Sequence, residues 1–207
     1  KSHLKGHPLG YDDWAVLPGQ GLYYNPDMIF PEGRKRIEGY CTDVVTDLAV
    51  EWLNDKRSND KPFMLMVQHK APHRNWMPAL RHLSLYDEID IPEPPTLFDE
   101  WKDNAPGARV QELEIDRHMD LNYDLFVDLT PDFNQPPSQK RQDRSAWHNM
   151  KRMSAVQLKA WRDHYAPRDK AFHEANLSGK ELVRWKFQRY AKNYLRCVKG
   201  VDESVDR

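Results

Sequence analysis

The chain has 207 residues, a length that suits one domain with a real hydrophobic core. A formal net charge of -1 gives no general reason to expect nucleic-acid binding, and no apolar run is long enough to span a bilayer. Cys41 and Cys197 are too few for a disulfide framework.

The first 110 residues alternate loop signals with short periodic segments. Residues 1–40 are rich in Gly, Pro, Tyr and Asp, which predicts long irregular loops. Residues 42–54 repeat apolar side chains at helical spacing, with Thr42 or Asp43 placed to cap the first turn. The five hydrophobic residues Phe63–Val67 predict a strand buried on both faces. Helix, short loop and buried strand make half of a βαβ unit, so we expect an α/β fold.

The second half ends in a long helix. Residues 92–95 contain three prolines and exclude regular structure there, while 111–175 is polar with helical signals around 155–165. Ser178 and Glu181 form a capping-box pattern at the start of a helix over 179–205. Its apolar residues recur in steps of three or four, which predicts a core-facing stripe and a solvated basic face. That basic face comprises Lys186, Arg189, Lys192, Arg196 and Lys199.

A cluster of cationic and imidazole side chains follows the expected strand: His69, Lys70, His73 and Arg74. Ligand sites in open α/β sheets form where loops leave the carboxyl ends of strands. Such a cluster suits a phosphate or sulfate group and offers a proton donor. The histidines are four apart, as in a helical zinc site, but Pro72 disfavours a helix there. For His69 alone we favour a buried, hydrogen-bonded role at the strand end.

Several strings occur together and in order along nearly the whole chain. They are Lys1-Ser2-His3-Leu4, Gly10-Tyr11-Asp12-Asp13-Trp14, and the runs 18–26, 39–53, 61–78 and 181–205. Together they resemble the type I, formylglycine-dependent sulfatases of the alkaline-phosphatase-like superfamily, in the bacterial branch that includes N-acetylglucosamine-6-sulfatases. The resemblance implies part of an alkaline-phosphatase-like mixed sheet flanked by helices, with long irregular loops. It also implies periplasmic or secreted enzymes that remove sulfate from glycans.

The resemblance implies roles for three residues in catalysis. Lys1 would bind a sulfate oxygen, His3 would contact the hydroxyl of the modified nucleophile, and His73 would stand beside the bridging oxygen as proton donor. A positioned acid also makes independent chemical sense, because ester cleavage releases an alkoxide, and fixed cations stabilise the transferring group. Recognition of the sugar would fall to Gln20, Arg74, Asn75 and Trp76.

The chain also departs from the family pattern. Neither cysteine stands in the Cys/Ser-x-Pro-x-Arg motif whose residue becomes formylglycine, and the Asp and Asn pairs that bind Ca²⁺ are absent. Ser2 replaces the usual Trp, and Lys5 precedes Gly6. The chain begins without Met and stops inside a helical pattern. We therefore expect 1–207 to be a central fragment of a sulfatase catalytic domain, inactive alone, whose buried strand would lack neighbours and expose apolar surface.

Three alternatives stay open. A phosphodiesterase or phosphonate hydrolase of the same superfamily would carry a different nucleophile. A non-catalytic, carbohydrate-binding paralogue would keep the pocket for recognition and lack the motif altogether. A structural metal module built on His69 and His73 would bind zinc stoichiometrically and lose it on substitution of His73.

Overall fold

The computed structural model describes residues 8–129, 133–134 and 141–207. Two short strands pair in antiparallel fashion, β1 (Asp27–Phe30) and β2 (Gly33–Arg36), with Asp27 opposite Arg36. The remaining elements are α1 (Cys41–Glu51), the π-helical turn η1 (Trp52–Lys56), the 3-10 turn η2 (Leu80–His82), α2 (Pro106–Arg109), α3 (Ile115–His118), α4 (Arg141–Lys151), α5 (Ala155–Ala175) and α6 (Gly179–Asp206). Helices, a small sheet and long irregular connections agree with the expected α/β class.

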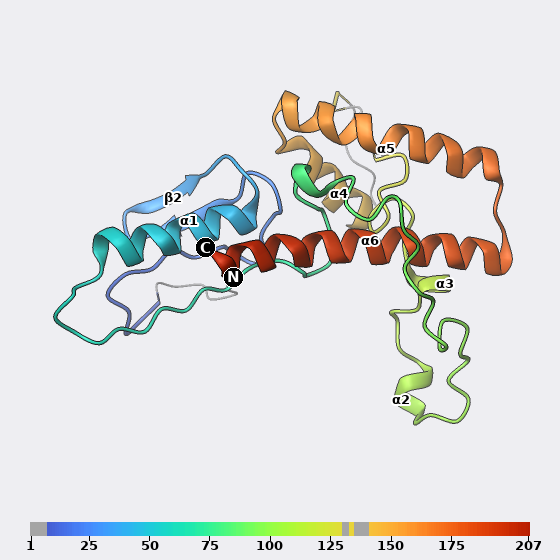
Figure 1. The fold of residues 1–207 in the computed structure, drawn as a ribbon, viewed down its shortest axis with the longest axis horizontal. Helices are drawn as coiled ribbons and strands as arrows, with labels where there is room; N and C mark the ends of the chain where they lie inside the picture. Colours follow the sequence, from blue (N-terminus) through green and yellow to red (C-terminus); the bar gives the residue numbers. More distant parts are fainter. Residues whose placement is uncertain (1–7, 130–132, 135–140) are drawn as a thin grey trace.

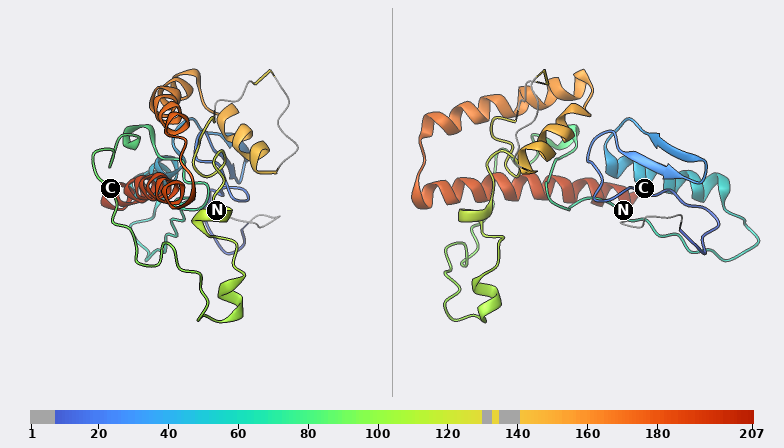
Figure 2. Two further views of the ribbon diagram at one scale, coloured as in Figure 1. Left: turned by 90° about the vertical axis from the view of Figure 1, so that its right-hand side faces the viewer. Right: turned by 180° about the vertical axis from the view of Figure 1, so that it is seen from behind.

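Helix α6 runs along the long direction of the molecule, and α5 lies beside it in the antiparallel direction (Figure 1). Helix α4 lies next to this helical pair, whereas α2 stands away from it on an extended arm (Figure 2). Helix α1 and the β1–β2 hairpin occupy the other end, where α1 contacts α6. In the described part of the chain, no helix combines the length and apolar character needed to cross a bilayer.

The starts of α1 and α6 differ from the predicted capping. Helix α1 confirms the periodic segment after residue 42, but Tyr40 precedes it and makes no side-chain cap. The Ser178 capping box is wrong: no cap hydrogen bond forms, and the chain enters α6 through the left-handed Gly179, with φ of 52°. A capping box occurs instead in α5, where Ser154 and Gln157 bond reciprocally.

The solvated basic face predicted for α6 is also wrong in part, because three of its five cations are buried. The short helix α3 and two irregular segments pack on α6, and their carbonyl oxygens accept hydrogen bonds from these side chains. Lys186 donates to Asp116, Arg189 to Leu125 and Arg196 to Leu85. The cations thus fasten these three segments to the helix.

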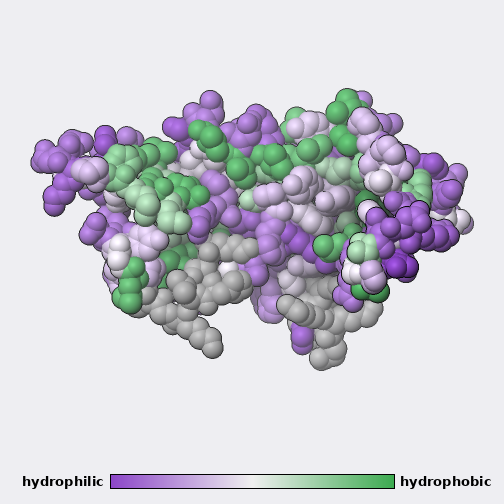
Figure 3. Space-filling model, turned by 90° about the horizontal axis from the view of Figure 1, so that it is seen from below, coloured by the Kyte–Doolittle hydropathy of each residue, from purple (hydrophilic) through white to green (hydrophobic). Residues whose placement is uncertain are grey.

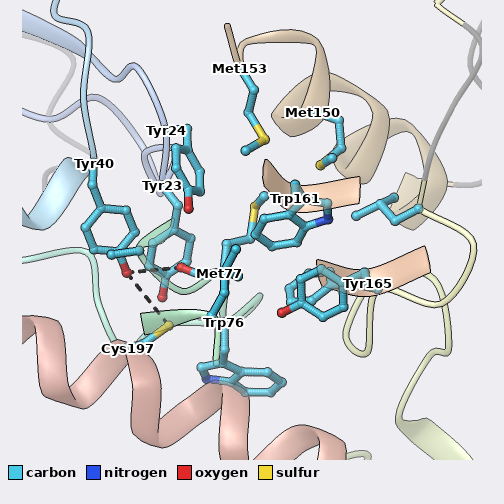
Figure 4. Packing of buried hydrophobic residues seen from close by; sticks show 14 of the residues in the cluster. Tyr23, Tyr24, Tyr40, Trp76, Met77, Met150, Met153, Trp161, Tyr165 and Cys197 are labelled. Atoms are coloured by element: carbon cyan, nitrogen blue, oxygen red, sulfur yellow. Dashed lines mark hydrogen bonds between the residues drawn. The ribbon is translucent and has the colours of Figure 1, made fainter. Parts of the chain in front are cut away.

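The main core is aromatic and lies between α6, α5 and the loops (Figure 4). Trp161 and Tyr165 of α5 are fully buried and pack with ring centroids 4.6 Å apart. On the other side Tyr40 donates a hydrogen bond to the carbonyl of Met77 and lies 3.9 Å from the sulfur of Cys197. This core holds the segment that follows residue 70 against the helices.

The predicted buried strand at Phe63–Val67 is wrong. The structure shows no strand over these residues, and Phe63, Met64 and Met66 are 50%, 72% and 53% exposed. A strand needs a neighbouring ladder for its backbone groups, and the described residues provide none beside this segment. The expected exposure of apolar surface is confirmed, and Figure 3 shows hydrophobic surface toward this end of the molecule.

Candidate functional site

The centre of the candidate site is His73, whose side chain is exposed on a loop with a fixed backbone. The amide of His73 donates to the carbonyl of Lys70 at 2.9 Å. The hydroxyl of the buried Tyr23 donates to the carbonyl of His73 at 2.7 Å. Both backbone polar groups of His73 are therefore satisfied, and the loop presents the imidazole from a defined position.

The imidazole also has a defined proton arrangement. Nδ1 of His73 lies 2.5 Å from the carbonyl oxygen of Arg74. A carbonyl oxygen only accepts hydrogen bonds, so Nδ1 must carry the proton. In the neutral ring Nε2 is then unprotonated, and in the protonated ring Nε2–H is the proton that can be transferred.

Arg74 is held by a buried carboxylate. Its Nε and Nη2 donate to the two oxygens of Asp124, each at 2.6 Å, and Asp124 is fully buried. This is the bidentate geometry that makes an arginine–carboxylate pair strong. The hydrogen bond with Asp124 is the main cause that raises the pKa of Arg74, so the guanidinium stays charged.

Asn75 and Trp76 make their contacts within the protein. The side-chain amide of Asn75 donates to the carbonyl of Tyr123 at 3.1 Å, and Asn75 is only 2% exposed. The indole N–H of Trp76 donates to the carbonyl of Pro72 at 2.9 Å, and its ring packs edge-on against Tyr190 of α6. Both side chains therefore hold the loop in place.

Gln20 lies in an exposed turn that is connected to the His73 loop. Gly21 closes the turn with φ of 66°, and a Cβ there would lie 2.4 Å from the side chain of Leu17. The ammonium of Lys70 donates to the carbonyl of Gln20 at 3.2 Å and stands over the Tyr23 ring at 4.6 Å. Since Tyr23 also bonds His73, the structure connects the Gln20 turn to the His73 loop through two buried side chains.

The other predicted residues have different outcomes. Lys1 and His3 lie outside the described residues. His69 is half-buried, and burial lowers the pKa of its imidazole. Its Nδ1 is buried without a hydrogen-bond partner among the described residues, so the predicted hydrogen bonding is missing at that nitrogen.

Two residues of the site escaped the sequence analysis. Tyr23 belongs to the aromatic run 18–26, whose density was a usable signal for a lined pocket. Asp124 lies in the polar stretch 111–175, and nothing in its spacing connects it with Arg74, fifty residues earlier. Only the fold brings that carboxylate to the site.

Comparison with known proteins places the whole chain within larger sulfatases. It is 37% identical over 211 residues to an N-acetylglucosamine-6-O-sulfatase of Bacteroides thetaiotaomicron, covering all of this chain and 37% of that protein. An N-acetylglucosamine-6-sulfatase of Capra hircus is 33% identical over 93 residues, which is 42% of this chain and 16% of the relative. No family model matches the sequence.

A solved structure agrees with the sequence comparison. It shows a protein in complex with its substrate, D-glucosamine-2-N,6-O-disulfate, and it superposes with a TM-score of 0.86 at 35% identity. The match covers all of this chain and 41% of that one, so the chain spans less than half the length of the relatives it matches. The chain therefore belongs to the sulfatase family, and its α/β elements are part of that family's alkaline-phosphatase-like fold.

Proposed function

We propose that the polypeptide containing this chain removes sulfate from a glycan, with a 6-sulfated N-acetylglucosamine or N-sulfoglucosamine as substrate. Support comes from the two relatives named as N-acetylglucosamine 6-sulfatases and from the glucosamine disulfate held by the structural neighbour. Action on glycans fits a periplasmic or secreted enzyme, and we propose that location as well.

The observation that carries this proposal is the exposed imidazole of His73 on its fixed loop. When the sulfur–oxygen ester bond breaks, its electron pair stays on the sugar oxygen, which needs a proton. Protonated His73 would donate that proton from Nε2, while Nδ1–H stays bonded to the Arg74 carbonyl. A positioned acid of this kind contributes about 10²–10⁴-fold to the rate.

The remaining roles follow from the family resemblance for Lys1 and His3 and from position for the other residues. Lys1 would bind a sulfate oxygen and His3 would contact the nucleophile, as the family resemblance implies. Gln20 and Arg74 would contact the sugar, since Arg74 is part-exposed and its Nη1 has no bond to another described residue. Asn75 and Trp76 would serve the site by holding the loop.

The resemblance also implies Ca²⁺ and a formylglycine nucleophile. The described residues contain no group of three or more His, Cys, Asp or Glu side chains placed to hold a metal. Burial raises the pKa of Cys41 to about 11 and of Cys197 to about 12, so neither thiol suits a nucleophilic role. Among the roles assigned to this chain, only the contact of His3 involves the nucleophile, and none involves Ca²⁺.

The test compares two leaving groups in the complete polypeptide and in its His73→Ala variant. Hydrolysis of N-acetylglucosamine 6-sulfate should fall about 10²–10⁴-fold, because the departing sugar oxygen needs protonation. Hydrolysis of 4-nitrophenyl sulfate should fall much less, because nitrophenolate leaves as an anion. Released sulfate and nitrophenol are the measurements.

His173→Ala is the matched control, since that histidine is exposed and pairs with Asp128 on α5's side of the molecule. It should leave both rates unchanged. Equal losses on both substrates in His73→Ala would remove the proton-donor role. Turnover of phosphodiesters alone would favour the phosphodiesterase alternative, and tight sugar binding without turnover would favour the carbohydrate-binding one.

A further inference from the structure

Asp124 is a charged side chain with no exposed surface, so its contacts must account for its charge. Its two oxygens accept from Nε and Nη2 of Arg74, and Oδ2 also accepts from the amide of Asp120 at 2.9 Å. Arg74 is its ion-pair partner. The carboxylate is thus committed to the loop that carries His73.

The segment around Asp124 is itself fastened to the helices. Arg189 of α6 donates to the carbonyl of Leu125 at 2.9 Å and to Asp169 of α5 at 2.6 Å. Asp169 in turn accepts from the amide of Asp128 at 3.0 Å. The carboxylate of Asp124 therefore projects from a turn that is anchored to α5 and α6.

From this geometry we infer that Asp124 is a positioning residue that orients the imidazole of His73 through Arg74. The side chain of Arg74 is gripped by Asp124, and its main-chain carbonyl accepts the proton of His73 Nδ1. Holding Arg74 in place therefore holds the acceptor that selects the Nδ1–H tautomer. The inference rests on the proposed function for its catalytic meaning, and it names the residue that keeps the proton on Nδ1.

The carbonyl of Arg74 fixes both the orientation and the tautomer of the His73 imidazole. A free imidazole prefers the other tautomer, with the proton on Nε2, so a fixed carbonyl at Nδ1 changes which nitrogen is protonated. Outer partners of this kind commonly orient functional histidines. A misplacement of about 1 Å at a reacting group can cost about 10²-fold in rate.

The direct test measures the tautomer of His73 in this chain with ¹⁵N-labelled histidine, by two-bond ¹H–¹⁵N correlation spectra above the histidine titration range. The unsubstituted chain should show His73 as the Nδ1–H tautomer. In Asp124→Asn, which keeps the size and removes the charge, the signals should shift toward the Nε2–H tautomer. Asp124→Glu should restore the Nδ1–H form in large part.

Asp87→Asn is the control, because Asp87 also pairs with a buried arginine, Arg196, at 2.7 Å, and its side-chain partners among the described residues lie in α5 and α6, away from the His73 loop. It should lower stability and leave the tautomer of His73 unchanged. Should Asp124→Asn not fold, Arg74→Lys keeps the cation and removes the two-pronged grip, and it should shift the tautomer in the same direction.

A His73 that is already the Nε2–H tautomer in the unsubstituted chain would overturn the inference, as would an unchanged tautomer in Asp124→Asn or, in its place, Arg74→Lys. These measurements need no substrate, so they succeed or fail independently of the sulfatase proposal. In the complete polypeptide, Asp124→Asn should lower kcat on the sugar sulfate about 10²-fold, and it should raise KM as far as the loosened Arg74 loses its contact with the sugar. Loss of 4-nitrophenyl sulfate turnover to the same extent would also contradict a role through the proton donor.

Discussion

Residues 62–69 and residues 70–79 are neighbours in the chain, but they differ in almost every physical respect. The first segment has no regular structure and exposes most of its apolar side chains. The second also lacks a strand, yet most of it is buried, with Met77 and Ala79 at 0% and 1% exposure. Residues 62–69 are the more apolar of the two segments and yet the more exposed, so composition does not explain the difference.

The difference is one of partners. Residues 70–79 receive hydrogen bonds and ring contacts from distant parts of the chain, including Tyr23, Tyr40 and Tyr190. Residues 62–69 have few such contacts; one is the hydroxyl of Tyr11, which donates to the sulfur of Met66 at 3.3 Å. An irregular loop whose polar groups are hydrogen-bonded and whose rings are packed can thus be held more firmly than an apolar segment that has no neighbouring strand.

Two methionine substitutions test this contrast with the largest expected effect. Met77→Ala removes a fully buried side chain from the aromatic core and should lower the free energy of unfolding by about 2–5 kcal/mol. Met64→Ala, at a residue 72% exposed, should change it by about 0.5 kcal/mol or less. Urea denaturation followed by circular dichroism measures both. Similar losses from the two variants would show that residues 62–69 are packed as well.

A second test compares His69 of residues 62–69 with His164, a buried histidine of α5. Burial, with smaller contributions from Arg168 and Arg196, lowers the pKa of His164 in α5 to about 3 from an ordinary value of 6.5. Below about pH 6.5, His164 is therefore protonated in the unfolded chain and still neutral in the folded chain. The stability from neutral His164 is complete above pH 6.5 and is lost as pH falls toward 3.

His164→Gln should accordingly flatten the dependence of stability on pH between 5 and 7, by at most about 1.4 kcal/mol per pH unit. His69→Gln is the comparison, since burial lowers the pKa of this half-buried histidine too. Its effect should be smaller. Urea midpoints at several pH values measure both slopes, and an equal flattening would show that residues 62–69 bury His69 as well as α5 buries His164.

Sequence periodicity predicted the two helices with a clear apolar stripe, because such a stripe is set by the helix's own residues, but it did not predict α4 in the polar stretch 111–175. The stripe after residue 42 and the one after 179 became α1 and α6. The strand at Phe63–Val67 failed for the opposite reason, since a strand depends on neighbours that a local pattern does not contain. The basic face of α6 failed similarly: no spacing rule reveals that loops will cover Lys186, Arg189 and Arg196.

The candidate site divides in the same way. The string 69–76 pointed to His73 and its loop, because imidazole and cations gathered in one short segment. The residues that hold the loop, Tyr23 and Asp124, come from about fifty residues away on either side. Functional side chains gathered in one segment could therefore be predicted from the sequence. The distant residues that fix their geometry could not.

The smallest expected effect is on the rate of methionine oxidation. Oxidation of exposed methionine side chains leaves the fold intact. Under dilute hydrogen peroxide, with tryptic peptides followed by mass spectrometry, Met64 should oxidise faster than Met66, and Met77 slowest. Met66 should lag behind Met64 because it is less exposed and its sulfur accepts the Tyr11 hydroxyl. Tyr11→Phe should speed oxidation of Met66 and leave Met64 and Met77 as they were. If Met64 and Met66 were as slow as Met77, residues 62–69 would have to be packed, and partners across the chain could no longer account for the difference between the two segments.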